Sequence, residues 1–503
     1  FCLHHIQYLS QTVTKLNFIN TLYITHKVIM KYVTKMIYKR PTFYLINRYR
    51  MKIFLIEILI ISICNSQIPK ECGQNFTLKT GTCCPKGEND LNPCGFPSKG
   101  ECLTVTINES PSGWDNYKDS RMLWPKYWFK KLCRCKKNFY GPSCTDCFYG
   151  YKGENCSEKY LITRRNIMSY NSREKEILVD VLVAMRQEYL DYLIVEEAYR
   201  NKPESLRLGN VHEMIVNIHF LAARFLIISN RRECKDSPVF NLNHKNIGFL
   251  TWHRHFMLLW EKWARKIAKK LFNIEDFSFP YWDWVDKTSC EICTDDLIGS
   301  EGEISDDDSF YLNTKSKFNK WKVYCNLFDP KNGILENSCS PCSSSKQSQR
   351  LKRRFITDTF PTKDHVRFAL SRKRFGSEFW KSKQFCEDFS VVLEGYCSPP
   401  EWHLSRSLHN SVHDNVIGSF AESTTSTNDP LFIFHHIQID RIFQAWWEKT
   451  SDEDKVYPNI SHPGHCFKCN QVGFIPAITH ERFFVDSENL GYQYDSFLFG
   501  KEN

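Results

Sequence analysis

The sequence predicts a mainly α fold: a four-helix bundle, preceded by a small disulfide-rich subdomain and interrupted by loop-rich insertions. Three observations support this fold class. Histidines recur at helical spacing in two distant stretches, and apolar residues recur every three or four positions around them. Ten cysteines crowd into residues 72–156 of the 503-residue chain. We therefore expect one large helical domain and one small cross-linked subdomain.

The first 66 residues do not resemble part of a folded domain. Residues 1–50 hold eight Lys and Arg and no Asp or Glu. Met51 then begins MKIFLIEILIISICNSQ, which is typical of a secretory signal peptide over residues 51–66. Because a signal peptide belongs at an N-terminus, we predict that residues 1–50 are translated upstream sequence, absent from the natural protein. A genuine basic leader is the alternative. The mature chain would start near Gln67 and be secreted or enter the lumen of the secretory pathway.

The charge of the chain points to no polyanionic partner. Residues 1–50 supply +8 of the formal +10, which leaves 67 − 8 = 59 basic residues against 57 acidic ones. We expect neither nucleic acid nor an anionic membrane to bind. No apolar run of about 18 residues follows residue 66, so we expect no transmembrane anchor in this chain. Either the protein is secreted and soluble, or the sequence lacks its C-terminal end.

Twenty cysteines remain after the leader and signal are set aside, which suits disulfides made in the secretory pathway. The stretch CRCKKNFYGPSCTDCFYGYKGENC resembles an EGF-like module, and we assign residues 67–158 to a Cys-rich subdomain. Zinc binding by Cys144 and Cys147 is the rival interpretation. The ten cysteines of this subdomain are Cys72, Cys83, Cys84, Cys94, Cys102, Cys133, Cys135, Cys144, Cys147 and Cys156.

Four sequons predict surface glycosylation in a secreted chain. They lie at Asn75, Asn108, Asn155 and Asn459.

Helical periodicity begins at about residue 159. Residues 171–193 are predicted as a helix that Ser172 caps, with acidic residues in the first turn. The next expected helices cover residues 212–225 and 252–272. The latter carries a core-facing stripe: Trp252, Phe256, Trp260, Trp263, Ile267 and Leu271. Helices over residues 405–415 and 430–448 complete the predicted four-helix core.

Residues 286–390 are predicted to be loop-rich. Cysteines brace this region, but their pairing does not follow from the sequence. Arg353-Arg354 offers a processing site, although a plain surface loop is the simpler interpretation. The cysteines concerned are Cys290, Cys293, Cys325, Cys339, Cys342, Cys386 and Cys397.

Two histidine sets carry the chemistry. His409 and His413 are four residues apart, so they share one helical face, and His436 follows an Asn-Asp-Pro that can start a helix. His219, His244 and His253 form the second set. Neutral imidazoles without paired thiolates suit copper or zinc, and the divalent affinity order favours copper.

Four blocks around these histidines resemble the tyrosinase family, whose members are type-3 (binuclear) copper proteins: GFLTWHRHFMLLWE, FPYWDW, LHNSVHD and NDPLFIFHHIQIDRIFQAWW. The resemblance runs from residue 72 to about Tyr494, and vertebrate members carry a similar Cys-rich head. It implies a catalytic domain over residues 159–500 with two copper ions. It also makes the second of the pair His435-His436 the ligand. The implied ligands are His219, His244 and His253 for one copper (CuA), and His409, His413 and His436 for the other (CuB).

The resemblance also implies the reaction. With O2, the enzyme would ortho-hydroxylate monophenols such as L-tyrosine and oxidise o-diphenols such as L-dopa to o-quinones, for pigment or protein cross-linking. Glu394 and Asn410 resemble the pair that holds a water in hydroxylating members. Asp440, one turn after His436, is expected to accept a hydrogen bond from a ligand ring, with a salt bridge to a nearby arginine such as Arg441 as the alternative. Leu242 stands where some members have a thioether-forming cysteine, so that link is absent.

Two other classes of protein fit the same six histidines. One is a zinc-containing tyrosinase-related protein without oxidase activity, because zinc has no redox chemistry. The other is an O2 carrier like haemocyanin, although this chain has a single copy of the unit. The sequence does not predict the oligomeric state.

Overall fold

The computed structural model describes residues 67–106, 120–126, 128–195, 206–224, 241–304, 310–324, 350–356, 360–377, 385–399, 407–460, 464–496 and 498. These residues belong to one compact unit, Ser62–Asn503. The predicted leader and signal peptide, Asn108, and Cys325, Cys339 and Cys342 lie outside the described residues.

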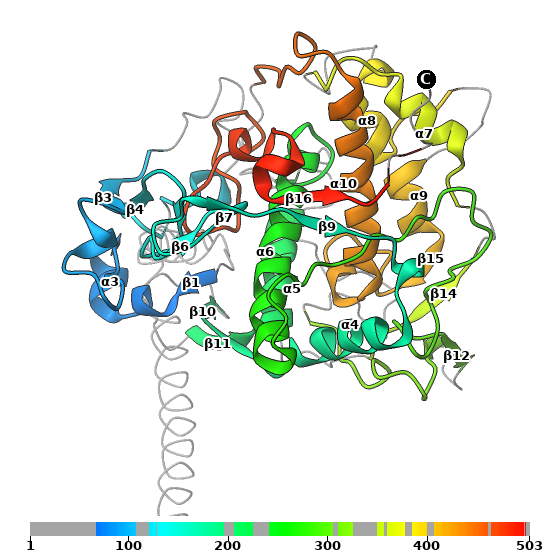
Figure 1. Ribbon diagram of the computed structural model, residues 1–503, viewed down its shortest axis with the longest axis horizontal. Coiled ribbons are helices and arrows are strands. Elements are labelled where there is room, and N and C mark those ends of the chain that lie inside the picture. The colour runs from blue at the N-terminus through cyan, green and yellow to red at the C-terminus, as the bar shows by residue number, and fades with distance from the viewer. Residues whose placement is uncertain are drawn as a thin grey trace, which may run out of the picture. The chain divides into compact units, whose positions relative to one another are not determined.

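Helices form the core of the described chain (Figure 1). The long helices α6 (Gly248–Phe272) and α10 (Leu431–Lys449) pack against each other. The other helices of this core are α4 (Ser172–Ala184), α5 (Val211–Ala223), α7 (Lys363–Leu370), α8 (Phe389–Glu394) and α9 (Leu408–Asp414). No helix among the described residues is long and apolar enough to cross a membrane.

The predicted stripe on α6 is buried except at its end. Trp252, Phe256, Trp260, Trp263 and Ile267 are all less than 5% exposed. Leu271 is 46% exposed, so its place in the core-facing stripe was a wrong prediction. Since α6 stops one residue later, at Phe272, the last turn runs past the core that covers the rest of the stripe.

The helix predicted over residues 171–193 ends at Ala184. Tyr189–Val195 instead forms strand β10, between β1 (Gln67–Pro69) and β11 (Leu206–Asn210) in an antiparallel sheet. Aromatic and β-branched residues favour the extended chain there. The predicted cap was also wrong by one residue. The Asn171 side chain accepts from the backbone N of Glu174 at 2.9 Å, and the Glu174 carboxylate accepts from the Asn171 backbone N.

This capping box gives a first prediction. Replacing Asn171 by Ala is expected to lower the free energy of unfolding by about 1 kcal/mol, because the backbone N–H of Glu174 loses its side-chain acceptor. The matched control is Ser172→Ala, one residue away, which is expected to change it by less than about 0.5 kcal/mol. Denaturant unfolding of both variants makes the comparison. Equal losses would show that the cap lies at Ser172 after all.

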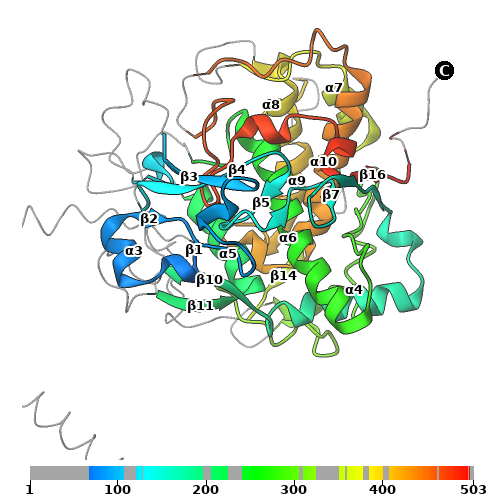
Figure 2. The same ribbon diagram turned by 60° about the vertical axis from the view of Figure 1, so that its left-hand side comes forward.

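The Cys-rich segment is held by five disulfides that use all ten of its cysteines. Strands β2 (Thr82–Cys83), β4 (Lys131–Cys135) and β3 (Gly100–Thr104) form a small sheet (Figure 2). Two-stranded ribbons follow: β5 (Phe139–Tyr140) with β6 (Asp146–Cys147), and β7 (Tyr151–Lys152) with β8 (Glu158–Lys159). The pairs are Cys72–Cys83, Cys84–Cys102, Cys94–Cys133, Cys135–Cys144 and Cys147–Cys156.

Cys144 and Cys147 both lie in disulfides, so the zinc interpretation of that pair is wrong. Three further disulfides between described cysteines brace the helical part of the chain. They are Cys290–Cys293, Cys386–Cys397 and Cys466–Cys469.

Short strands tie the region after α6 to the core. Strand β12 (Glu301–Ile304) pairs with β13 (Phe310–Leu312), and β14 (Arg353–Phe355) pairs with β15 (Val416–Gly418). Arg353 is fully buried and forms a two-pronged ion pair with Asp429, at the start of α10. Both interpretations of Arg353, as a processing site and as part of a surface loop, were therefore wrong.

The first and last strands of the helical region lie side by side. Strand β9 (Ile162–Arg164) runs parallel to β16 (Tyr492–Tyr494), with Ile162 opposite Tyr492. Both strands pass across α6 and α10 in Figure 1. A single buried arginine of β9 therefore reaches both long helices, as described below.

Candidate metal centre

Two groups of buried histidines meet between the helices. In the first, His219 comes from α5, His244 from the loop before α6 and His253 from α6. The Nε2 atoms of His219 and His253 are 3.4 Å apart. In each group the candidate donor atoms all lie within 4.8 Å of one another, so each could hold one metal ion.

In the second group, α9 carries His409 and His413, one turn apart, and α10 carries His436. The Nε2 atom of His436 lies 3.3 Å from that of His409 and 3.5 Å from that of His413. The rings of His253 and His436 stack with their centres 4.5 Å apart. The two groups therefore face each other across the contact between α6 and α10.

Hydrogen bonds on the far side of the rings set their orientation. His253 Nδ1 donates to the Phe249 carbonyl at 2.9 Å, and His413 Nδ1 donates to the Phe420 carbonyl at 2.9 Å. His409 Nδ1 donates to the side-chain oxygen of Asn410 at 3.1 Å. A neutral ring that donates from Nδ1 keeps a lone pair on Nε2, the form that binds metal.

The electrostatics of the site keep these rings neutral. Burial lowers the pKa of His253 to about 3. Burial, reinforced by the neighbouring histidines, also lowers the pKa of His219, His244, His409 and His436 well below the usual value. Several lone pairs aimed at one another within 3.5 Å repel unless a cation lies between them. The donor set therefore fits a metal ion in each group.

A fourth histidine joins the second group. His435 is fully buried, and its ring centre lies 5.1 Å from that of His409 and 5.0 Å from that of His413. The family pattern had set it aside in favour of its neighbour. Sequence spacing alone did not separate the two, because consecutive residues on a helix point only about 100° apart.

Glu394 and Asn410 lie on α8 and α9, which pack against each other. One carboxylate oxygen of Glu394 accepts from the backbone N of Lys245 at 2.5 Å, next to His244. The other oxygen, and the side-chain nitrogen of Asn410, have no hydrogen-bond partner within the described ranges. Burial raises the pKa of Glu394 to about 8, although Lys245 opposes the rise.

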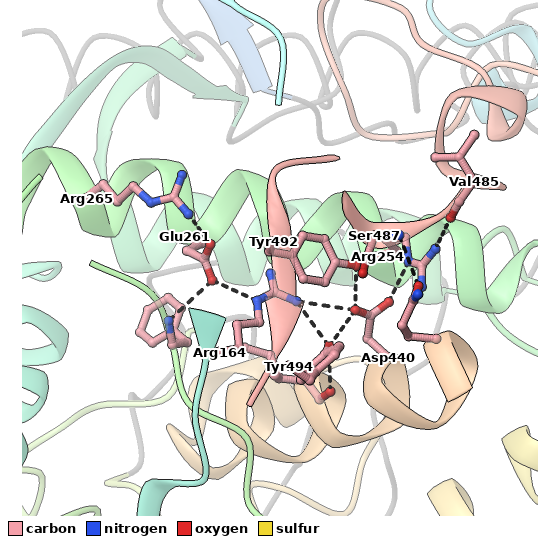
Figure 3. Close-up of polar contacts among 12 residues, drawn as sticks. Arg164, Arg254, Glu261, Arg265, Asp440, Val485, Ser487, Tyr492 and Tyr494 are labelled. Carbon is pink, nitrogen blue, oxygen red and sulfur yellow. Dashed lines mark hydrogen bonds and ion pairs between the residues drawn. The ribbon is translucent and has the colours of Figure 1, made fainter. Parts of the chain in front are cut away.

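Asp440 has different partners from those expected (Figure 3). Its carboxylate accepts from Arg254 Nε at 2.6 Å, from Arg164 Nη1 at 3.3 Å, and from the hydroxyls of Tyr492 and Tyr494 at 2.6 and 2.7 Å. Burial opposes its ionisation, but Arg254 and Arg164 hold the pKa of this carboxyl below its usual value.

The hydrogen bond expected from a ligand ring to Asp440 is not found among the described residues. The alternative, a salt bridge to an arginine, is confirmed, but the partners are Arg254 and Arg164. Arg441 pairs with Asp283 at 3.0 Å instead. Arg254 follows His253 on α6, and Asp440 lies one turn after His436 on α10. Their ion pair consequently ties together the two helices that carry these histidines.

The predicted glycosylation sites are surface positions where the structure describes them. Asn75, Asn155 and Asn459 are exposed.

Comparison with known proteins decides the family. Residues 209–449 match the family model of the common central domain of tyrosinase, a range that includes all six histidines. A tyrosinase of Gallus gallus is 31% identical over 456 residues, covering 87% of this chain and 83% of that protein. The chain belongs to the tyrosinase family. The protein is therefore an oxidoreductase, and its cofactor is a pair of copper ions.

Two further proteins are similar to this chain. The 5,6-dihydroxyindole-2-carboxylic acid oxidase of Mus musculus is 29% identical over 454 residues, covering 86% of this chain and 82% of that protein. A solved copper-bound tyrosinase of Aspergillus oryzae is 15% identical and covers 69% of this chain and 95% of that one, with a TM-score of 0.36.

Proposed function

We propose that this protein hydroxylates monophenols such as L-tyrosine at the ortho position and oxidises o-diphenols such as L-dopa to o-quinones, with O2 as oxidant. The observation that carries the proposal is the pair of facing histidine groups, in which the Nε2 atoms of five of the six histidines lie 3.3–3.5 Å from a neighbouring Nε2. Bound copper would supply one-electron redox chemistry at each ion, so the pair can accept the two electrons of a catechol.

We assign the six histidines as ligands in their two groups. The roles of the chain's other atoms follow from their hydrogen bonds. The carbonyls of Phe249 and Phe420 and the amide of Asn410 hold three rings in the binding tautomer. Phe432 stacks on His436 with ring centres 4.0 Å apart, and Phe249 packs 4.7 Å from both His253 and His409. These aromatic rings exclude water from the donor atoms.

Glu394 and Asn410 hold the water that takes the proton of an incoming monophenol. Each offers one buried polar atom without a partner in the described chain, an acceptor on Glu394 and a donor on Asn410. Two divalent ions nearby would offset the burial that raises the pKa of Glu394 to about 8, and would keep it ionised. An ionised carboxylate is the form that accepts a proton through the water.

The rest of the chain suits a secretory-pathway protein. We infer that residues 67–158 form an EGF-like subdomain, that residues 159–500 form the catalytic domain around a four-helix bundle, and that the exposed sequons are glycosylated. Eight disulfides among the described residues support an oxidising compartment.

The assignment of Glu394 gives a second prediction. With Glu394→Gln, hydroxylation of L-tyrosine is expected to fall about 100-fold in kcat/KM, because general-base assistance is lost. Oxidation of L-dopa is expected to fall far less, because a catechol loses its protons more readily. The control is Glu387→Gln, a surface carboxylate of the preceding turn that is 55% exposed. Equal losses on both substrates would reduce Glu394 to a structural role.

Metal analysis of the copper-loaded chain tests the function as a whole. About two coppers per chain with turnover of L-tyrosine support the proposal. Two retained zincs without dopa oxidation would favour a non-oxidising relative. Two coppers that bind O2 without turnover would favour a carrier.

A further inference from the structure

His244 is the one candidate ligand of the six that lies on a loop rather than a helix. Inside this loop, residues 241–247, the side-chain oxygen of Asn241 accepts from the backbone N–H groups of Asn243 at 3.2 Å and His244 at 2.6 Å. Lys245 has a left-handed backbone, with φ of 59°. A ligand on such a tight turn keeps its position only if the turn itself is held from outside.

A segment distant in sequence, which contains His465, holds this loop in place. The Nε2 of His465 donates to the backbone carbonyl of Asn241 at 2.9 Å, 224 residues away in sequence. The ring of His465 is fully buried. The adjacent Cys466–Cys469 disulfide closes the turn that carries this ring, and the Tyr457 hydroxyl donates to the His465 carbonyl at 2.6 Å.

A second histidine fixes the base of that turn. His480 Nε2 donates to the Gly464 carbonyl at 2.7 Å, so its Nδ1 is the acceptor for the Thr251 hydroxyl, also at 2.7 Å. Thr251 lies on α6, two residues before His253. The segment that carries His465 and His480 is therefore hydrogen-bonded both to the loop that carries His244 and to the helix that carries His253.

The hydrogen bonds continue without a break to the Cys-rich segment. The Gln471 side chain donates to the Thr251 carbonyl at 3.1 Å and accepts from His255 Nδ1 at 2.7 Å. The other ring nitrogen of His255 then accepts from the Tyr140 hydroxyl, at 3.2 Å. The rings of His480 and His255 each donate from one nitrogen and accept at the other, which is the pattern a single fixed neutral tautomer allows, and His465 donates from Nε2.

Burial accounts for the neutral state of these rings. It lowers the pKa of His255 and His480 to about 3 and that of His465 to about 4. The rings of His465 and His480 also pack tightly against the start of α6. A Cβ added to Gly248, the first residue of α6, would lie 2.4 Å from His465 Nδ1 and 2.8 Å from His480 Cε1.

We propose that His465 is a positioning residue of the first copper group, and that its hydrogen bond to Asn241 holds the loop on which His244 lies. The proposal rests on His244 being a copper ligand. It gives residues 464–480 a function that their sequence does not suggest: their histidines hydrogen-bond the loop and the helix that carry two of the ligands, and so hold both in place. Loss of the His465 donor would let the loop relax and weaken copper in the first group about 10- to 100-fold, with the second group unchanged.

The test uses the full chain, copper-loaded and then dialysed against a graded chelator. His465→Leu removes the donor, whereas His465→Gln places an amide N–H close to the position of Nε2. The control is His365→Gln, a change of a half-exposed histidine on α7. We expect His465→Leu to retain about one copper per chain, while His465→Gln and the control retain two. A lone Cu(II) in the second group gives an electron paramagnetic resonance signal that a coupled pair does not.

Gly248→Ala provides a second variant should His465→Leu not fold. It keeps the ring and its donor but displaces them, because the added methyl group has no room. The same selective loss from the first group is expected. Unchanged copper affinity of the first group in the folded variant, or failure of His465→Gln to restore it, would overturn the proposal. A wild-type chain that does not hold two coppers would instead refute the proposed function.

Discussion

Replacing His436 by Phe is expected to remove one copper per chain and to abolish phenol oxidation. The Nε2 of His436 lies within 3.5 Å of the donor atoms of both His409 and His413, so its loss leaves only two of the three ligands assigned to this copper. Removing a ligand outweighs the 10- to 100-fold loss that follows from disturbing a ligand's partner, so we expect a fall of more than about 100-fold in kcat. Phenylalanine preserves the packing against Phe432, so the fold should survive.

The decisive comparison is His435→Phe, the same substitution one residue earlier. His435 lies in the same cluster, but the family pattern makes His436 the ligand. Metal analysis of both variants should give two coppers for His435→Phe and one for His436→Phe. The reverse result would transfer the ligand role to His435.

Replacing Asp440 by Asn is expected to lower the free energy of unfolding by about 3–5 kcal/mol, the usual loss when one partner of a buried ion pair is removed. Arg164 and Arg254 are at most 1% exposed, and both depend on this carboxylate. Glu261 also pairs with Arg164, at 3.2 Å, but Arg254 has no other carboxylate partner in the described structure. An unpaired buried guanidinium is the source of the loss.

Denaturant unfolding measures this loss. Asp452→Asn is the control, because Asp452 is 96% exposed in its pair with Lys455 and its replacement should leave the midpoint unchanged. A loss below about 1 kcal/mol for Asp440→Asn would mean that water reaches the arginines. Copper content is also expected to fall, since the two helices tied by Asp440 carry His253 and His436.

The sequence predicted the six candidate ligands because their spacing and flanking residues are local. The helices α5, α6, α9 and α10 were predicted for the same reason. The end of α4 was missed because the leucines of YLDYLIV continue the helical pattern, although its aromatic and β-branched residues favour a strand, and pairing with β1 and β11 decides between the two. Asn171 and Ser172 are both good caps, so the choice between them needed a hydrogen bond.

The partners of Asp440 and the role of His465 could not be predicted from the sequence, for a different reason. Arg164 precedes Asp440 by 276 residues, and Asn241 precedes His465 by 224. A lone Arg or His in an irregular segment has no periodicity that points to its partner. Such pairs become visible only when the chain is folded.

The parallel pairing of β9 with β16 has a consequence for biosynthesis. Arg164 is translated early, yet its hydrogen-bond partners include Asp440 and the hydroxyl of Tyr494, which leave the ribosome more than 270 residues later. Contacts so distant in sequence form late, because a long loop must close before they contribute. In the growing polypeptide, Arg254 of α6 therefore has no carboxylate partner among the described residues until Asp440 of α10 has been synthesised. Both histidine groups are complete only after α10, which carries His436, has been synthesised, so the insertion of both copper ions must follow that point.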